Sequence, residues 1–259
     1  MQRIISWNVA SVRARMPVLT GFLRQEQPDF VFLQEIKATE ETFPFMDLRI
    51  EGYRAVISGQ KGYNGVAILA KEKIINIEDK LADFTDQARF IQAETSAGVT
   101  LISVYVPNGN PPEKNPEDRT RLEYKLRWME ALNQHVENLI RQGKKVIVGG
   151  DFNVIERDTD VYNPEVFREG ALLNEAVREA YGKMEKAGMK NAVREFHPEP
   201  HTYSFWDFQG GAWARNNGIL LDAIWVTPDI HVVESRIYKE IRGKAGTSDH
   251  GPVSIDFLE

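Results

Sequence analysis

The chain alternates short, largely apolar runs with polar, turn-rich segments over its whole length. Residues 4–7 and 30–33 have the pattern of buried strands. Between them, apolar side chains in residues 17–27 recur at helical spacing, and Pro28 ends that pattern before the second run. The chain is therefore predicted to open with a strand, a helix and a second strand.

The next apolar runs form two pairs, each separated by turn residues. Residues 53–57 and 66–70 flank a glycine-rich loop, and residues 90–95 and 99–106 flank the short turn at 96–98. Such connections are typical of antiparallel neighbours. The chain then enters residues 107–118, a segment with four prolines that is predicted to be exposed and either mobile or functional.

Two amphipathic helices are predicted in the second half. Apolar side chains of residues 122–140 recur every three or four positions up to Gly143, which precedes a strand at 146–148. A second helix is predicted over residues 172–187, ending at Gly188. Strands that alternate with helices in this way predict an α/β (α+β) fold with two mixed sheets packed together and covered by helices. Since no linker or low-complexity tract divides the chain, residues 1–259 are predicted to form a single catalytic domain.

Polar side chains follow several of the predicted strands directly. Asn8, Glu35 and Asp151 each come at the end of an apolar run, where loops can gather them at one rim of a sheet. Asp151 and Asn153 are two positions apart and can face one target on an extended segment. Together with Asp249 and His250 further along, these residues supply ligands for a hard divalent cation, a group for an attacking water and donors for a charged transition state. This set predicts metal-assisted phosphodiester hydrolysis.

Composition narrows the class of protein. An apolar content of 42% supports a substantial core, and the absence of cysteine excludes disulfides and thiolate metal sites. The chain has neither a signal peptide nor a long apolar run, so we expect a cytoplasmic protein without a membrane role. A net charge of −6 argues against indiscriminate nucleic-acid binding but allows a local basic face. Any one basic residue alone is more typical of a solvated charge. The candidates for this basic face are Lys37, Lys61, Arg215, Arg242 and Lys244.

An ordered series of motifs extends this prediction to a family. In chain order they are Asn8, Leu-Gln-Glu35, Lys61-Gly-Tyr-Asn-Gly-Val, Val104-Tyr-Val-Pro-Asn, Gly-Asp151-Phe-Asn153, Tyr203-Ser-Phe-Trp206, Leu221-Asp222 and Ser-Asp249-His250-Gly-Pro. The series resembles the exonuclease III family, the class II apurinic/apyrimidinic (AP) endonucleases of the endonuclease/exonuclease/phosphatase superfamily. The resemblance covers essentially the whole chain, and eight motifs in order are far more specific than one.

The resemblance implies a four-layer αββα sandwich and a Mg²⁺-dependent DNA repair nuclease, with Mn²⁺ as a substitute. Members cleave the phosphodiester 5′ to abasic sites in duplex DNA. Bacterial members commonly also remove nucleotides or blocking groups from 3′ ends during base excision repair. The implied partner is double-stranded DNA with abasic sites or damaged 3′ ends. We expect a monomeric, prokaryotic-type enzyme in the cytoplasm, associated with the nucleoid through DNA.

The resemblance also assigns roles at the metal and the attacking water. Glu35 matches the main metal ligand, and Asn8 matches a position that supports the metal or the phosphate. Asp151 would take a proton from the water or orient it, and Asn153 would hold that aspartate or the phosphate. The plain alternatives are a solvated acid at a strand end for Glu35 and turn-forming residues for the others.

A second group of matched positions would contact the phosphate. His250 would bond a non-bridging oxygen while Asp222 fixes its orientation. Asp249 matches either a second metal ligand or an orienting acid, and the sequence leaves both open. Tyr105 matches a phosphate contact, although a tyrosine in a strand is commonly half-buried packing.

Substrate choice would depend on an apolar slot that admits a flipped abasic sugar and excludes a base by volume. Each slot residue alone could equally be plain core. The slot candidates are Phe205, Trp206, Ile219 and Leu221, and the other substrate-binding candidates are Lys61, Tyr63, Asn108 and Asn216.

The chain departs from the family pattern at two residues and one loop. Ala10 replaces a common Asn or Asp, and Leu220 replaces a basic residue before Asp222. The first change puts a secondary metal interaction in doubt, and the second puts one phosphate contact in doubt. The loop after Tyr105 is also richer in proline, which could alter the grip on the duplex.

Two alternatives remain from the sequence. The same centre could hydrolyse RNA or a small phosphorylated substrate, since fold alone does not separate these activities. A DNA-binding protein that has lost its chemistry should lack carboxylates at the site, and none of the matched carboxylates is missing. Removal of the metal should abolish the activity of a nuclease and spare simple binding.

Overall fold

The strands of the chain form two six-stranded mixed sheets. The structure is a computed structural model and describes residues 1–258. The first sheet, in spatial order, contains β11 (His231–Ile237), β12 (Val253–Leu258), β1 (Gln2–Asn8), β2 (Phe30–Gln34), β4 (Val66–Ala70) and β3 (Arg54–Ser58). The second contains β5 (Ile75–Glu78), β6 (Phe90–Glu94), β7 (Val99–Tyr105), β8 (Lys145–Asp151), β10 (Asp222–Val226) and β9 (Lys190–Asn191).

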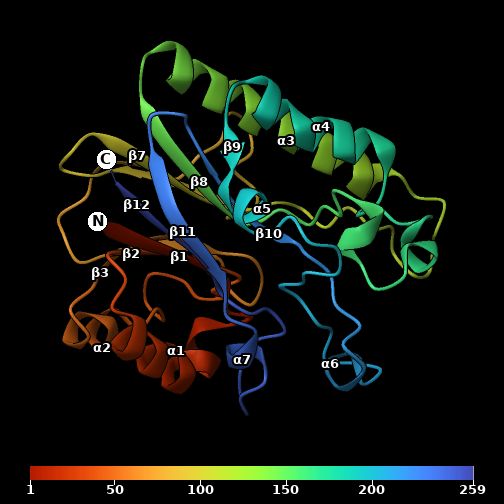
Figure 1. The fold of residues 1–259 in the computed structure, drawn as a ribbon, viewed down its shortest axis with the longest axis horizontal. Helices are drawn as coiled ribbons and strands as arrows, with labels where there is room; N and C mark the ends of the chain where they lie inside the picture. Colours follow the sequence, from red (N-terminus) through yellow and green to blue (C-terminus); the bar gives the residue numbers. More distant parts are fainter. Residues whose placement is uncertain (259) are drawn as a thin grey trace.

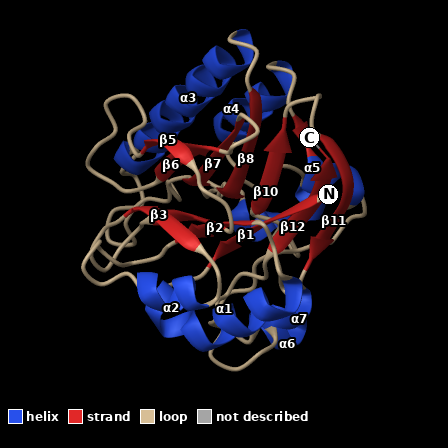
Figure 2. Cartoon of the chain, turned by 90° about the vertical axis from the view of Figure 1, so that its left-hand side faces the viewer, coloured by secondary structure: helices blue, strands red, loops and turns tan. Residues whose placement is uncertain are grey.

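Helices cover the outer face of each sheet. Figures 1 and 2 show α1 (Val12–Glu26), α2 (Phe45–Ile50) and α7 (Lys239–Arg242) beneath the first sheet, and α3 (Thr120–Arg141) and α4 (Glu175–Lys186) above the second. The shorter elements are α5 (Ala192–Phe196), α6 (Ala212–Arg215), η1 (Asp158–Asp160) and η2 (Pro164–Phe167). The predicted four-layer αββα sandwich is therefore confirmed.

An apolar core joins the two sheets. Phe32 and Ile68 of the first sheet belong to the same buried cluster as Leu101 and Ile147 of the second. The layers approach so closely that a Cβ on Gly149 would lie 2.7 Å from Cδ2 of Phe32. Two further buried clusters lie between each sheet and its helices. The rigid sandwich is thus suited to holding side chains at its edges in fixed positions.

One rim of the sandwich collects the ends of the central strands. β1 and β2 run parallel with Asn8 opposite Gln34, and β7 and β8 run parallel with Tyr105 opposite Asp151. β10 runs antiparallel to β8, so Asp222, at its beginning, lies opposite Asp151. Polar residues that are far apart in the sequence therefore meet at this rim.

Two predicted helix boundaries were wrong. The first helix begins at Val12 rather than at residue 17 and contains Pro17. The helix predicted from residue 172 begins at Glu175, because the side chain of Asn174 caps it by accepting bonds from two backbone N–H groups. Leu172 instead joins a small apolar cluster beside the rim. Within residues 1–258, no helix is both long and apolar enough to cross a lipid bilayer.

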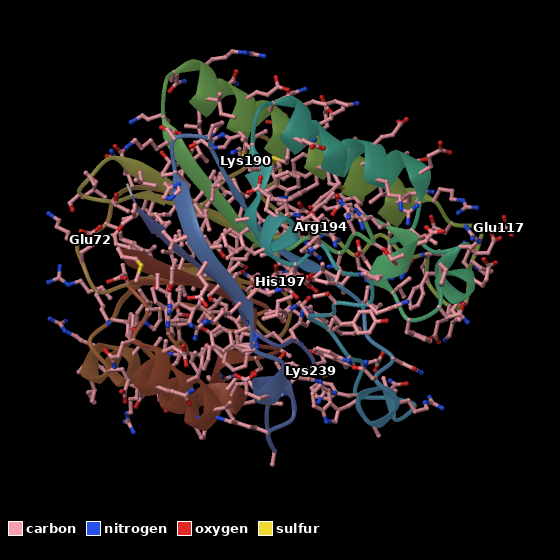
Figure 3. All side chains as sticks on the ribbon, viewed as in Figure 1. Glu72, Glu117, Lys190, Arg194, His197 and Lys239 are labelled. Atoms are coloured by element: carbon pink, nitrogen blue, oxygen red, sulfur yellow. The ribbon has the colours of Figure 1, made fainter. Side chains whose placement is uncertain are left out.

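A buried ion pair fastens the irregular segment between β8 and α4. Arg194, labelled in Figure 3, lies on α5 and donates to Asp160 at 2.5 Å and to Glu156 at 3.2 Å. Asp160 in turn accepts a bond from the backbone N–H of Leu220 through its carbonyl oxygen. This contact ties η1 to the chain that leads into β10.

Candidate active site

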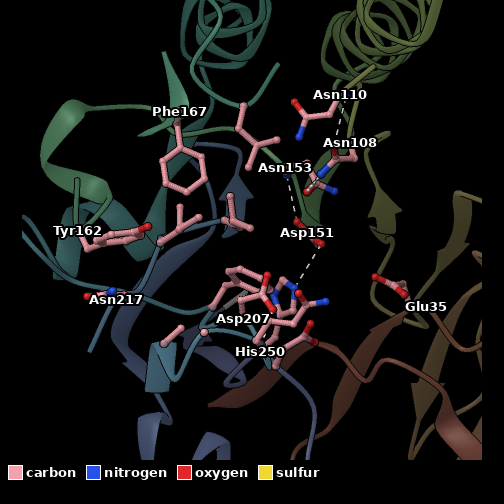
Figure 4. Close-up of a pocket in the computed structure, with 18 of the residues that line it drawn as sticks. Glu35, Asn108, Asn110, Asp151, Asn153, Tyr162, Phe167, Asp207, Asn217 and His250 are labelled. Carbon is pink, nitrogen blue, oxygen red and sulfur yellow. Dashed lines mark hydrogen bonds and ion pairs between the residues drawn. The ribbon is translucent and has the colours of Figure 1, made fainter. Parts of the chain in front are cut away.

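A polar cavity of about 420 Å³ opens at the rim where the strand ends meet. Figure 4 shows Asp151 near its centre, linked to Asn153 on one side and to His250 on the other, with Glu35 across the pocket. Of the residues predicted from the sequence, the lining includes Glu35, Tyr105, Asn108, Asp151, Asn153, Phe205, Ile219, Leu221, Asp249 and His250. The structure therefore brings most of the predicted site together.

Glu35 is held at the end of β2 by three donors. Its Oε1 accepts bonds from Asn8 Nδ2 at 3.0 Å and from the Tyr105 hydroxyl at 2.9 Å, and Lys37 Nζ lies 2.9 Å from Oε2. Burial opposes the charge, but the bonds from Asn8 and Lys37 outweigh it and lower the pKa of Glu35. Glu35 is thus a charged carboxylate at neutral pH, and it faces the cavity.

The Glu35 carboxylate is an oxygen ligand of the kind that a hard divalent cation prefers. In residues 1–258, no group of three or more His, Cys, Asp or Glu side chains could hold a metal ion. A metal here would rest on the Glu35 carboxylate, with water and a substrate phosphate as further ligands, a common mode for Mg²⁺. Asp249 lines the same cavity and accepts a bond from the Ser248 hydroxyl at 3.1 Å.

Asn8 lies beneath the cavity and joins two of its carboxylates. Its Nδ2 donates to Glu35 and also to Asp151 Oδ2, each at 3.0 Å. Its Oδ1 accepts the backbone N–H of Ala10 at 3.1 Å, and Ala10 has a positive φ of 47°. The direct contacts of Asn8 therefore align the carboxylates with each other. Its predicted support of the metal would act through Glu35.

Asp151 and His250 form a buried pair that Asp222 completes. His250 Nε2 lies 3.6 Å from Asp151 Oδ2, and His250 Nδ1 lies 2.8 Å from Asp222 Oδ2. Burial raises the pKa of Asp151 to about 7, although the charge on His250 opposes this. Burial also disfavours charge on His250, but Asp222 and Asp151 outweigh it and raise the pKa of His250 to about 10. The imidazolium form is therefore favoured at neutral pH.

Ser204 completes the support of His250, and it was not among the predicted site residues. Its hydroxyl donates to Asp222 Oδ2 at 2.6 Å and accepts the backbone N–H groups of Leu221 and Asp222. Ser204 lies inside the Tyr203-Ser-Phe-Trp206 motif, and this motif was the sequence feature from which its place at the site could have been predicted.

Asn153 is fixed in an uncommon backbone conformation. Its φ is +50°, and its N–H donates to Asp151 Oδ1 at 3.0 Å. Its Nδ2 donates to the Val106 carbonyl at 2.9 Å, and its Oδ1 accepts from Asn108 Nδ2 at 3.3 Å. Non-glycine residues in this region are strained and persist only where their surroundings hold them. The loop after β7 therefore helps to orient Asp151 through Asn153.

An apolar wall closes the other side of the cavity. Phe205, Ile219 and Leu221 line it as predicted, and Ile219 pairs with the backbone of Phe205. Tyr162 and Phe167, which sequence reasoning missed, extend the wall with an edge-to-face contact of 6.0 Å between ring centroids (Figure 4). Their segment carries no regular hydrophobic period, so no pattern pointed to them.

Four predicted substrate-binding residues lie outside the cavity lining. Trp206 is buried, and its indole N–H donates to Asn216 Oδ1 at 3.1 Å, so it packs behind the wall rather than on it. Lys61 and Tyr63 are exposed on the loop between β3 and β4. Their DNA contacts remain predictions.

Leu220 shows why a departure from the family pattern is tolerated. Its side chain is buried and belongs to the core between the sheets. It cannot serve as a phosphate contact. Among the candidates for a basic face, Lys37 and Arg215 lie at the site, and Arg242 is buried against the rings of Phe208 and Trp213.

Comparison with known proteins agrees with this geometry. The chain is 29% identical over 262 residues to an exodeoxyribonuclease of Bacillus subtilis, covering 98% of each chain. A 3′ phosphatase from Neisseria, solved with a product DNA hairpin, superimposes with a TM-score of 0.93 at 32% identity and covers 100% of both chains. An AP endonuclease from Archaeoglobus fulgidus gives a TM-score of 0.93 at 31% identity, again over 100% of both chains.

These similarities confirm the resemblance to the exonuclease III family and make the chain an enzyme that hydrolyses phosphoester bonds. Relatives of this kind are metal-dependent nucleases. The family model matches residues 5–250, a span that runs from β1 to His250 and contains every contact of the site described above. The chain belongs to the Endonuclease/Exonuclease/phosphatase family.

Proposed function

We propose that this DNA repair nuclease of the exodeoxyribonuclease III type uses Mg²⁺ to hydrolyse the phosphodiester 5′ to abasic sites in duplex DNA. The same centre would remove nucleotides or blocking groups from 3′ ends. Mn²⁺ would substitute for Mg²⁺, and the enzyme would act as a monomer. Relatives described as an AP endonuclease and as a 3′ phosphatase support this pair of activities.

One observation carries the proposal. A continuous series of contacts runs from Glu35 through Asn8 to Asp151 and on through His250 to Asp222. It crosses from the first sheet to the second and lies beside an apolar wall. Candidates for a cation ligand, a base and a cationic donor therefore lie in one cavity beside an apolar wall, which supports the proposal.

Asp151 would accept a proton from the attacking water. Its two oxygens are already oriented, because Oδ1 accepts the Asn153 N–H and Oδ2 accepts the Asn8 amide. Water would attack the phosphorus, and the bond to the 3′ oxygen would break. The 3′ oxygen would take up a proton from solvent water, which leaves a 3′ hydroxyl and a 5′ phosphate. A positioned base of this kind typically contributes about 10² to 10⁴ in rate.

His250 would donate a hydrogen bond from Nε2–H to a non-bridging phosphate oxygen. Asp222 holds the opposite nitrogen and keeps the ring charged, so Nε2 carries a proton to offer. A cationic donor in a buried site stabilises the negative charge that develops on the phosphate. The Asp222 carboxylate is itself held by Ser204.

Mg²⁺ held by Glu35 would act as a Lewis acid on the phosphate. Asn8 and Tyr105 orient the Glu35 carboxylate toward the cavity through their bonds to Oε1. Lys37 favours the charged form of Glu35 and would add a positive group near the phosphate. The apolar wall of Phe205 and Ile219 would then receive the flipped sugar and exclude a base by its volume.

An end-labelled duplex with one internal abasic analogue tests the proposal. The parent enzyme with Mg²⁺ should cut 5′ to the analogue, and EDTA should stop it. Asp151→Asn should lower kcat by about 10² to 10⁴. Asp256→Asn is a matched control, because Asp256 is a buried acid paired with Arg3 at the far end of β1.

The outcomes separate the alternatives. Shortening from 3′ ends without internal cutting would restrict the enzyme to exonuclease work. An intact duplex in every lane would overturn the DNA proposal and favour RNA or a small phosphoester. Equal losses in Asp151→Asn and Asp256→Asn would remove Asp151 from its role.

A further inference from the structure

A lysine without a role in the mechanism lies against the segments that carry Asn108 and Asn153 at the cavity. Lys125 is on α3 and is fully buried, with 0% of its surface accessible. Its Nζ donates to the main-chain carbonyl of Asn153 at 2.5 Å and to that of Asn108 at 3.1 Å. Burial lowers the pKa of Lys125 to about 7. A buried amine is costly, so an apolar residue would serve better if filling space were its only task.

The two carbonyls belong to residues that orient the base. Asn153 has its left-handed backbone, and its N–H reaches Asp151 Oδ1. Asn108 donates to Asn153 Oδ1 from the opposite loop. Lys125 therefore joins two separate segments, one after β7 and one after β8. In the segment after β8 it holds Asn153, which contacts Asp151, and in the segment after β7 it holds Asn108, which contacts Asn153.

The stem of Lys125 is also enclosed by the loop it holds. Gly109 has a φ of +83°, and a Cβ at this position would lie 2.7 Å from Cδ of Lys125 and 3.1 Å from Cβ of Ala171. Only glycine allows the backbone to pass this closely. The loop after β7 is thus packed against the lysine along its length.

We propose that Lys125 is a positioning residue that holds the main-chain carbonyls of Asn108 and Asn153 and so fixes the Asn153 N–H on Asp151. The lysine acts through Asn153 and does not touch the substrate. The effect of Lys125 on catalysis rests on the role proposed for Asp151, whereas its effect on the position of Asn153 is independent of that role.

Lys125→Met tests the proposal because it keeps an unbranched stem and removes the donor. We expect kcat on the abasic duplex to fall by about 10- to 100-fold, the range for misplaced catalytic groups, with KM and DNA affinity within about threefold. Lys125→Arg retains a donor and should recover part of the lost kcat. Leu132→Ala is the matched control. It shortens a buried side chain on the same helix, and that side chain packs in the apolar cluster between the second sheet and its helices.

Amide hydrogen exchange at Asn153 provides a readout that does not depend on catalysis. The Asn153 amide should exchange faster in Lys125→Met than in the parent, and it should stay protected in Leu132→Ala at equal global stability. If the parent proves inactive on DNA, this measurement still decides the role of Lys125.

Three results would overturn the proposal. The first is a folded Lys125→Met variant with unchanged kcat. The second is unchanged exchange at Asn153. The third is an equally folded Lys125→Arg variant that is no more active than Lys125→Met, which would assign the lysine to packing alone.

Discussion

The Asp151 side chain accepts hydrogen bonds from residues that follow or belong to strands of both sheets. One oxygen accepts from Asn8 of the first sheet, and the other accepts from Asn153 at the end of the second. Neither of these two donors is charged, and the positive charge of His250, whose Nε2 lies 3.6 Å from Oδ2, lowers the pKa of Asp151 by less than burial raises it. Burial therefore dominates and raises the pKa of Asp151. A group tuned toward neutral pH is suited to exchange protons with water.

The raised pKa of Asp151 predicts that activity falls at acidic pH. Only the charged carboxylate can accept a proton, and its pKa is raised to about 7. The rate constant kcat/KM should therefore rise about tenfold per pH unit below pH 7 and level off above it. Initial rates on the abasic duplex at constant ionic strength measure this profile.

DNA affinity over the same pH range is the control, because it separates the base from binding. A profile that is flat from about pH 5 to 7 would contradict a raised pKa at Asp151. Bound Mg²⁺ would move the limit downward, since a nearby cation favours the charged carboxylate.

The residues of the site differ in how far the sequence could predict them. Asp151, Glu35 and His250 lie in short motifs beside apolar runs, so their types and neighbours mark them. Lys125 carries no such mark, because it falls on the apolar stripe of α3 between Leu122 and Met129, where a hydrophobic residue is expected. Its acceptors are main-chain carbonyls, which leave no trace in a sequence.

The elements that build the apolar wall are irregular, and a buried ion pair holds them together with isolated backbone bridges such as the one between Phe205 and Ile219. Asp160 in η1 is 1% exposed and pairs with Arg194 of α5. Glu156 gives the same arginine a second, more exposed partner. Because the carbonyl of Asp160 binds the Leu220 N–H, this pair also positions the neighbouring Ile219 of the wall.

Arg194→Met should therefore destabilise the protein strongly. The change leaves the buried Asp160 carboxylate without its cationic partner, a loss of about 3 to 5 kcal/mol in the free energy of unfolding. Urea unfolding followed by circular dichroism measures it. Arg141→Met removes an exposed pair with Glu137 and should cost less than about 0.5 kcal/mol. Equal midpoints for the two variants would show that the buried pair does not stabilise this segment.

Element types were easier to predict than element ends and partners. The helical period identified α1, α3 and α4, but local contacts set their ends: Asn174 caps α4, and α1 begins five residues before Pro17. Strand pairing depends on contacts across the whole chain. β1 pairs with β12 from the opposite terminus, and no local pattern encodes that register.

For the whole molecule, the apolar cores that stabilise the fold are distinct from the candidate cation site, and this predicts the effect of metal removal. Three large apolar clusters stabilise the layers, whereas the candidate cation site around Glu35 lies at the rim, and residues 1–258 contain no group of three or more His, Cys, Asp or Glu that could hold a metal ion. EDTA should abolish cutting and lower the melting temperature by less than about 2 °C, because binding near its dissociation constant adds only about 0.4 kcal/mol. Added Mg²⁺ or Mn²⁺ should restore activity, whereas Glu35→Gln should stay weakly active with either ion. A fall of about 10 °C in EDTA would instead make the metal a structural part of the fold.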